Sequence, residues 1–203
     1  MVKRIAIFAS GSGSNFEAIV QATRSGRLEG AEVALLVCDK PGAKVLERAE
    51  RLGVEAFAFE PKAYPGKAAF ETKIVAELRR RDVALVVLAG YLRLVGPTLL
   101  SAYEGQIINL HPSLLPAFPG KDAIGQALAY GVKITGVTVH VVDAGLDTGP
   151  IIAQVPVAVH ETDTAESLAA RIHEVEHELL VDVIGQLLAG RMRLDGRHVR
   201  LEK

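Results

Sequence analysis

The chain has a single cysteine, and its charges almost cancel. Cys38 is the only cysteine among 203 residues, so an intramolecular disulfide is impossible and the framework of a small disulfide-bonded secreted protein is excluded. The net charge is -1 and no run of like charge stands out, so the sequence shows no electrostatic basis for binding nucleic acid or a membrane. These absences favour a cytoplasmic protein that acts on small molecules.

The amino terminus has little of what a signal peptide needs. Two basic residues precede a short apolar run that ends at Ala9, and residues 10–15 interrupt it too early for a signal sequence or a membrane span. The run is typical of a buried first strand instead. With 49% hydrophobic residues, the chain has enough apolar material for a substantial core.

Short apolar runs alternate with segments of helical spacing. Runs rich in Val, Ile and Leu, typical of strands covered on both faces, occupy residues 4–9, 32–37, 56–59, 84–89, 106–110 and 135–142. Helix-like segments occupy 15–25, 43–52, 68–81 and 167–189, and 191–203 is typical of a terminal hairpin or strand. The alternation predicts an α/β fold with a doubly wound, mostly parallel, Rossmann-like sheet, and the absence of repeats or linkers predicts a single domain over 1–203.

A glycine-rich turn, SGSGSN at 10–15, separates the first predicted strand from the first predicted helix. Its backbone N–H groups and the helix amino terminus suit a phosphate, whereas Phe16 replaces the third glycine of a dinucleotide fingerprint. A tight turn that needs glycine only for its backbone angles explains the turn equally well. Asn15 is expected to cap the helix, and Asp39, after the second strand, is expected to be a solvated loop residue.

Asn109 and His111 interrupt a buried strand on one face. The strand period of two places both on the same side, close to the carboxyl end, where α/β sheets bind ligands. A structural histidine with an asparagine that ties down the next loop is the plainer interpretation. The pairing, the position at the sheet edge and the proline-rich loop that follows favour chemistry.

The loop at 143–150 supplies two carboxylates, Asp143 and Asp147. If its strand neighbours that of His111, Asp147 approaches the imidazole and stabilises its protonated form. An imidazolium and a carboxamide can together donate to the oxyanion of an acyl-transfer intermediate. Thr138 and His140, on one face of the preceding strand, are expected to support this group.

Two motifs suggest other enzyme classes. DTG at 147–149 matches aspartic proteases, but those need two carboxylates in a β-rich fold and the tripeptide occurs once here. HEVEH at 173–177 formally contains the H-E-x-x-H pattern of zinc proteases. A charged helix face is the favoured interpretation of that stretch.

Four motifs follow one another over nearly the whole chain: ASGSGSN (9–15), LAGYLR (88–93), NLHPSLLP (109–116), and GVTVH (136–140) running on to DTGP (147–150). In this order they resemble the folate-dependent formyltransferases. The resemblance implies that 10-formyltetrahydrofolate donates a formyl group to the amine of 5-phosphoribosylglycinamide in de novo purine biosynthesis, with no metal. It further implies a nucleotide-binding half at 1–105, a catalytic and folate-binding half at 106–203, and a possible homodimer.

The resemblance also assigns roles to individual residues. The catalytic residues are Asn109, His111 and Asp147, with Thr138 and His140 behind them. The ribonucleotide is bound by Gly13, Ser14, Asn15 and Glu176. The folate is bound by Lys67, Leu92, Arg93, Leu94, Val95 and Asn109, together with the loop at 142–147. Asp39 and His173 depart from the family pattern.

Relatives with other activities share the catalytic motifs. Methionyl-tRNA formyltransferase carries an additional carboxyl-terminal RNA-binding domain, and formyltetrahydrofolate hydrolase an amino-terminal regulatory domain, so the length of this chain favours neither. A non-enzymatic nucleotide-binding module would leave Asn109, His111 and Asp147 without a task. Cys38, at the end of an apolar strand, is expected to pack and not to react.

Overall fold

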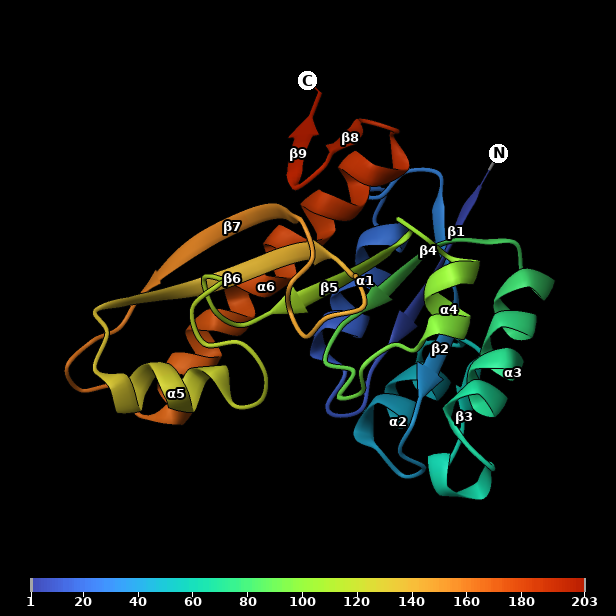
Figure 1. Cartoon of the computed structure of the whole chain (residues 1–203), viewed down its shortest axis with the longest axis horizontal. Helices are drawn as coiled ribbons and strands as arrows, with labels where there is room; N and C mark the ends of the chain where they lie inside the picture. Colours follow the sequence, from blue (N-terminus) through green and yellow to red (C-terminus); the bar gives the residue numbers. More distant parts are fainter. Residues whose placement is uncertain (1, 203) are drawn as a thin grey trace. The chain divides into compact units, whose positions relative to one another are not determined.

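The computed structural model describes residues 2–202 of the chain (Figure 1). The chain divides into two compact units, Met1–Asn109 and Leu110–Lys203. The boundary falls inside one strand, two residues before His111. The functional halves expected at 1–105 and 106–203 remain a prediction.

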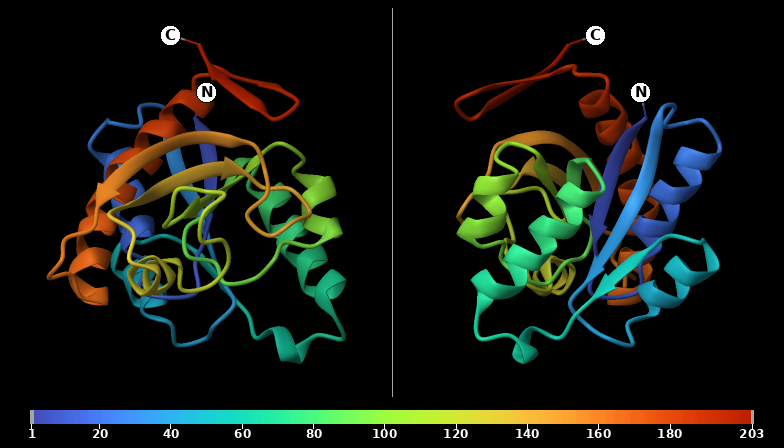
Figure 2. Two further views of the ribbon diagram at one scale, coloured as in Figure 1. Left: turned by 60° about the vertical axis from the view of Figure 1, so that its left-hand side comes forward. Right: turned by 90° about the vertical axis from the view of Figure 1, so that its right-hand side faces the viewer.

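The first unit is built on parallel strands in the order β3-β2-β1-β4-β5. Their bounds are β1 Lys3–Phe8, β2 Ala31–Cys38, β3 Ala56–Ala58, β4 Val83–Leu88 and β5 Ile107–His111. The helices are α1 Ser14–Arg24, α2 Lys44–Arg51, the short 3-10 turn Pro61–Ala63, α3 Lys67–Arg80 and α4 Pro97–Ala102. In Figure 2, α1 and α3 cover opposite faces of β1 and β2. Because both faces are covered, residues Ile5 to Phe8 are fully buried, as their apolar run requires.

The second unit is built around a long helix and an antiparallel strand pair. Its elements are α5 Ala123–Tyr130, β6 Ile134–Val141, β7 Ile151–Ala158, α6 Ala165–Leu188, and the hairpin β8 Met192–Asp195 and β9 His198–Leu201. A capping box starts α6, in which Thr164 accepts from the N–H of Ser167 and the Ser167 hydroxyl accepts from the N–H of Thr164. The helix then packs on α5, β6 and β7.

The predicted α/β class with a mostly parallel sheet is confirmed, and so is the terminal hairpin. The six expected strands and four expected helices are present within two residues of their predicted ends. The sequence analysis missed α4, α5 and β7. None of the helices described combines the length and apolar character that crossing a membrane would require.

The predicted helix cap at Asn15 is wrong. Helix α1 begins at Ser14, its N-cap is Gly13 in a left-handed conformation with φ of 79°, and no side chain caps it. A Cβ at Gly13 would lie 2.4 Å from Cγ2 of Val45, at the start of α2. Glycine is therefore required here both by the backbone angle and by the close approach of α2.

We predict that Gly13→Ala lowers the free energy of unfolding by about 2–4 kcal/mol, because it adds a steric clash to a left-handed backbone. Gly26→Ala is the matched control, since Gly26 also has a positive φ but open space around it. The control variant should lose only about 1 kcal/mol. Equal losses for the two variants in urea unfolding would show that contact with Val45 is unimportant.

Candidate active site

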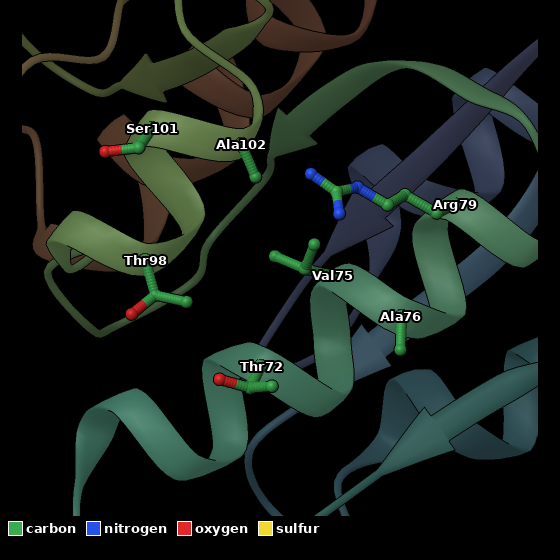
Figure 3. Close-up of a pocket in the computed structure, with 7 residues that line it drawn as sticks. All are labelled: Thr72, Val75, Ala76, Arg79, Thr98, Ser101 and Ala102. Carbon is green, nitrogen blue, oxygen red and sulfur yellow. The ribbon is translucent and has the colours of Figure 1, made fainter.

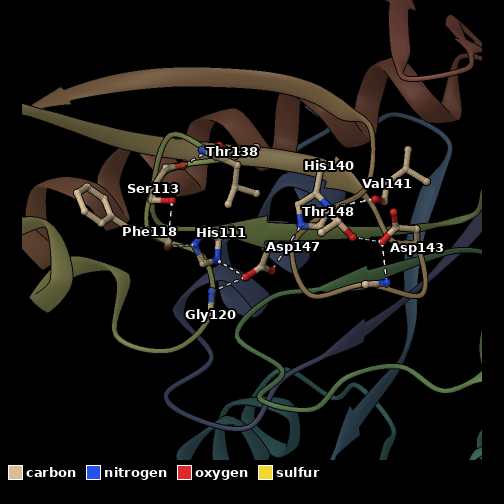
Figure 4. A network of polar contacts seen from close by, with 12 residues as sticks. His111, Ser113, Phe118, Gly120, Thr138, His140, Val141, Asp143, Asp147 and Thr148 are labelled. Atoms are coloured by element: carbon tan, nitrogen blue, oxygen red, sulfur yellow. Dashed lines mark hydrogen bonds and ion pairs between the residues drawn. The ribbon is translucent and has the colours of Figure 1, made fainter.

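His111 ends β5 with oxygen acceptors near both ring nitrogens (Figure 4). Nε2 lies 2.8 Å from the carbonyl oxygen of Phe118, and Nδ1 lies 3.5 Å from Oδ2 of Asp147. The residue is 5% exposed. The ring therefore has an oxygen atom beside each nitrogen. The approach of Asp147 to His111 that the sequence analysis expected is present, and the catalytic role of the pair remains a prediction.

Asp147 is held from a second side by the backbone. Its Oδ2 accepts a hydrogen bond of 2.7 Å from the N–H of Gly120, in the loop that follows His111. Its own backbone has φ of 55°, an uncommon left-handed conformation for a residue other than glycine. The carboxylate is thus fixed in position, and its side chain is 10% exposed.

His140 lies beside the same carboxylate, and its surroundings favour the neutral form of its ring. Its Nε2 lies 3.8 Å from Oδ1 of Asp147, and its Nδ1 donates to the carbonyl oxygen of Val141 at 2.9 Å. Burial lowers the pKa of His140 from its ordinary value, against the opposing influence of the Val141 hydrogen bond and Asp147. The neutral ring therefore predominates, with its proton on Nδ1.

Thr138 supports the loop after His111 and does not contact the imidazole itself. Its hydroxyl donates to the carbonyl oxygen of Ser113 at 2.6 Å and accepts from the N–H of Leu115 at 3.1 Å. The hydroxyl of Ser113 in turn donates to the carbonyl oxygen of Ala117 at 2.6 Å. These bonds fix the proline-rich loop that brings Phe118 and Gly120 to the site, two contributions that no sequence motif had indicated.

The two carboxylates of the 143–150 loop do different things. Asp143 accepts from the N–H of Gly145 at 3.0 Å and from the hydroxyl of Thr148 at 2.7 Å, so it shapes its own loop. The recorded neighbours of Asp147 are two imidazoles and a backbone N–H, which is not the paired-carboxylate arrangement of an aspartic protease.

Asn109 lies two residues before His111 on β5 and pairs in register with Leu88 of β4. It is half-buried, whereas Ile107 and Ile108 before it are fully buried. This placement agrees with the polar face that the strand period predicts.

The residues expected to bind the ribonucleotide lie in different units. Gly13, Ser14 and Asn15 form the uncapped start of α1. Glu176 lies in α6, where it is 4% exposed, and its Oε2 accepts from Nδ1 of His173 at 2.8 Å. This hydrogen bond raises the pKa of His173. Among the described residues, no group of three or more His, Cys, Asp and Glu is arranged to hold a metal ion.

The expectation that Asp39 is a solvated loop residue is wrong. Asp39 is 4% exposed, and its carboxylate accepts from the Ser10 hydroxyl and from Nε of Arg93 at 2.7 Å. The residue can be buried because Arg93, 54 positions away, neutralises its charge. Cys38, its neighbour, is buried as expected, and burial raises the pKa of its thiol.

Four of the residues expected to bind folate, at positions 92–95, form a short segment after β4. Lys67, at the start of α3, donates from Nζ to the carbonyl oxygen of Leu94 at 2.9 Å. Leu92 and Leu94 are more than half exposed, whereas Val95 is buried. The segment therefore presents two apolar side chains to solvent.

A separate pocket of about 440 Å³ lies between α3 and α4 (Figure 3). It is lined by Thr72, Val75, Ala76, Arg79, Thr98, Ser101 and Ala102. None of the predicted site residues is among them, so this pocket is distinct from the site expected from the sequence.

Comparisons with known proteins agree with the geometry. Residues 3–184 match the family model described as formyl transferase. The chain is 59% identical to phosphoribosylglycinamide formyltransferase of Bacillus subtilis over 92% of its own length and 95% of that protein. Its structure resembles glycinamide ribonucleotide transformylase 1 of Symbiobacterium toebii, with a TM-score of 0.96 and 46% identity over 100% of this chain and 95% of that one. The corresponding enzyme of Geobacillus kaustophilus gives a TM-score of 0.89 and 63% identity over 93% and 100%. The chain therefore belongs to the formyl transferase family and is an enzyme of its phosphoribosylglycinamide formyltransferase group.

Proposed function

We propose that the chain transfers the formyl group of 10-formyltetrahydrofolate to the amine of 5-phosphoribosylglycinamide. The observation that carries this proposal is the buried His111 imidazole between Asp147 and a second oxygen acceptor. Acyl transfer needs a fixed donor for the oxyanion, and a protonated ring held in this way is such a donor. The names of the relatives indicate the acceptor, and the family implies a folate-derived donor.

The reaction then requires no covalent enzyme intermediate. The amine nitrogen attacks the formyl carbon, a new C–N bond forms, and the carbonyl oxygen becomes an oxyanion to which Asn109 and His111 donate. Collapse breaks the bond to the folate nitrogen. The proton lost by the attacking amine reaches that leaving nitrogen through water, with Asp147 helping to carry it and holding His111 charged.

The two histidines beside Asp147 divide into one charged and one neutral ring. Burial favours the neutral form of His140, and its Nδ1–H donates a hydrogen bond to the carbonyl oxygen of Val141. His111 faces oxygens with both nitrogens, so the positive charge belongs on His111. His140 then serves to pack against Asp147 without competing for its negative charge.

His111 must exchange one partner for catalysis. Its Nε2 donates to the Phe118 carbonyl in the structure, and Nδ1 faces Asp147. For His111 to donate to the substrate, the formyl oxygen takes the place of the Phe118 carbonyl.

The remaining assignments follow the resemblance. The uncapped start of α1 at Gly13, Ser14 and Asn15 offers backbone N–H groups for the phosphate, and Glu176 offers a carboxylate for the ribose hydroxyls. Leu92, Leu94 and Val95 supply apolar contacts for the pterin ring, with Lys67 and Arg93 adding positive charge for the acidic end of the folate.

Purified protein given both substrates should release tetrahydrofolate and formylate the glycinamide amine, which can be followed by absorbance and mass spectrometry. Methionyl-tRNA and water are the competing acceptors, because relatives with the same motifs use them. Formylation of the tRNA, or hydrolysis with no transfer to the glycinamide, would overturn the proposal.

His111→Ala and Asp147→Asn should each lower kcat by about two or more orders of magnitude, since each removes charge that stabilises the transition state. His198→Ala is the control, because His198 is exposed in the terminal hairpin. Rates within a few-fold of the wild type for either site variant, with the fold intact by circular dichroism, would contradict the assigned roles.

The burial of His140 predicts a specific loss of stability in acid. The unfolded ring takes up a proton near pH 6.5 and the folded ring does so only at lower pH, so the free energy of unfolding falls as the pH drops below about 6.5. The steepest contribution is about 1.4 kcal/mol per pH unit. Urea unfolding from pH 7.5 to 5 should show a smaller loss for His140→Gln than for the wild type.

His198→Gln is the matched control and should follow the wild-type profile. The charged or titratable groups that act on His140 are Asp147, His111 and Asp143, and all three remain in both variants. Parallel profiles for His140→Gln and the wild type would show that folding does not shift the pKa of His140.

A further inference from the structure

The segment Leu92–Val95 exposes apolar side chains although its backbone is held firmly. Leu92 is 59% exposed and Leu94 51% exposed, while Val95 is buried and Arg93, with a side chain 39% exposed, bonds to Asp39. The two exposed leucines, two positions apart, offer apolar surface that a ligand can cover. They can be useful to a ligand only if the backbone that carries them is fixed in advance.

A buried carboxylate fixes the amino-terminal end of the segment. Asp39 accepts from Nε of Arg93 and from the hydroxyl of Ser10. The same Ser10 oxygen accepts a hydrogen bond of 3.0 Å from the N–H of Leu92, and the N–H of Ser10 donates to the carbonyl oxygen of Gly90 at 2.9 Å. Asp39 thus acts on the segment both directly and through the first residue of the glycine-rich turn.

A second buried carboxylate fixes the other end. Glu71 of α3 is 3% exposed and accepts from the N–H of Gly96 at 2.6 Å and of Leu99 at 3.3 Å, at the start of α4. A Cβ at Gly96 would come within 2.9 Å of both carboxylate oxygens, so glycine is needed for this approach. Lys67, one turn earlier on α3, holds the carbonyl oxygen of Leu94.

We propose that Asp39 and Glu71 are positioning residues that preorganise Leu92–Val95 for the folate. This inference rests on the proposed function only for the identity of the ligand. Neither carboxylate is expected to touch a substrate, because each is buried and already bonded to protein donors. They act through the backbone that carries Leu92 and Leu94.

The two residues differ in one respect that separates their effects. Glu71 bonds to Gly96, which follows the segment, and to Leu99 in α4, whereas Asp39 is joined through Ser10 to the turn that leads to Gly13. Loss of the Asp39 bonds should therefore disturb both the folate segment and the proposed phosphate turn. Loss of the Glu71 bonds should disturb the folate segment alone.

The test uses the isosteric variants Asp39→Asn and Glu71→Gln in the full-length chain. Glu71→Gln should raise the KM for 10-formyltetrahydrofolate about 10-fold with the nucleotide KM and kcat nearly unchanged, and Asp39→Asn should raise both KM values. Amide hydrogen exchange in residues 90–96 should be faster in both variants. Glu104→Gln, which alters an exposed acid of the same unit, should change none of these quantities.

Exchange measurements keep the anchoring role separate from the formyl-transfer assignment. If the wild-type chain fails to transfer formyl groups, the proposed function falls while hydrogen exchange still measures the anchoring. Unchanged exchange at 90–96 in both variants, or faster exchange without any change in the folate KM, overturns the inference. If Asp39→Asn does not fold, Ser10→Ala removes the link from Asp39 to Leu92 and should raise both KM values in its place.

Discussion

The site depends on one buried imidazole that has an oxygen on each side. A buried charge is tolerated only where it is paired and hydrogen-bonded, so the imidazolium that we propose at His111 requires Asp147 and a second acceptor in place before any substrate arrives. Both partners lie on loops without a regular strand or helix to hold them. The loop after β5 is therefore fastened by Thr138, and the loop after β6 by Asp143. Preorganised charge that stabilises an oxyanion is usually the largest single contribution of a protein to such catalysis.

Much of this arrangement is readable in the sequence, because it is local. Asn109 and His111 were predicted together from a strand period of two, and their place at the end of the strand follows from the next residue being Pro112. The glycine-rich turn was equally clear, although Gly13 caps α1 where Asn15 was expected to do so. Six strands and four helices were predicted because their apolar residues repeat at the right spacing. Strand β7 was not predicted because Pro156 and several exposed residues interrupt its apolar pattern. Such a pattern is typical of an edge strand, and in the described registers β7 pairs only with β6.

The residues that were predicted wrongly or not predicted at all are those whose surroundings come from far along the chain. Asp39 has the sequence context of a solvated loop, and only the return of Arg93 to its side makes burial possible. Glu71 looks like any acid on an amphipathic helix, yet the start of α4 folds onto it. The carbonyl of Phe118 belongs to the backbone, so no pattern of residue types predicts its contact with His111. A sequence shows that an acidic residue needs a partner if it is buried, but it does not show where that partner lies. Local sequence patterns therefore predict the burial of acidic residues poorly.

The same kind of hydrogen bond recurs in three irregular segments. A carboxylate accepts from the backbone N–H of an irregular segment: Asp147 from Gly120, Glu71 from Gly96, and Asp163 from His160 before α6. Loops lack the hydrogen-bond ladders that fix strands and helices, and their N–H groups need acceptors once they are shielded from water. A charged acceptor gives a stronger bond than a neutral one and fixes two directions with its two oxygens. In Asp147 the oxygen that accepts from Gly120, Oδ2, is also the one that faces Nδ1 of His111, so the bond that holds the loop after β5 also orients the carboxylate beside the ring that we propose acts on the substrate.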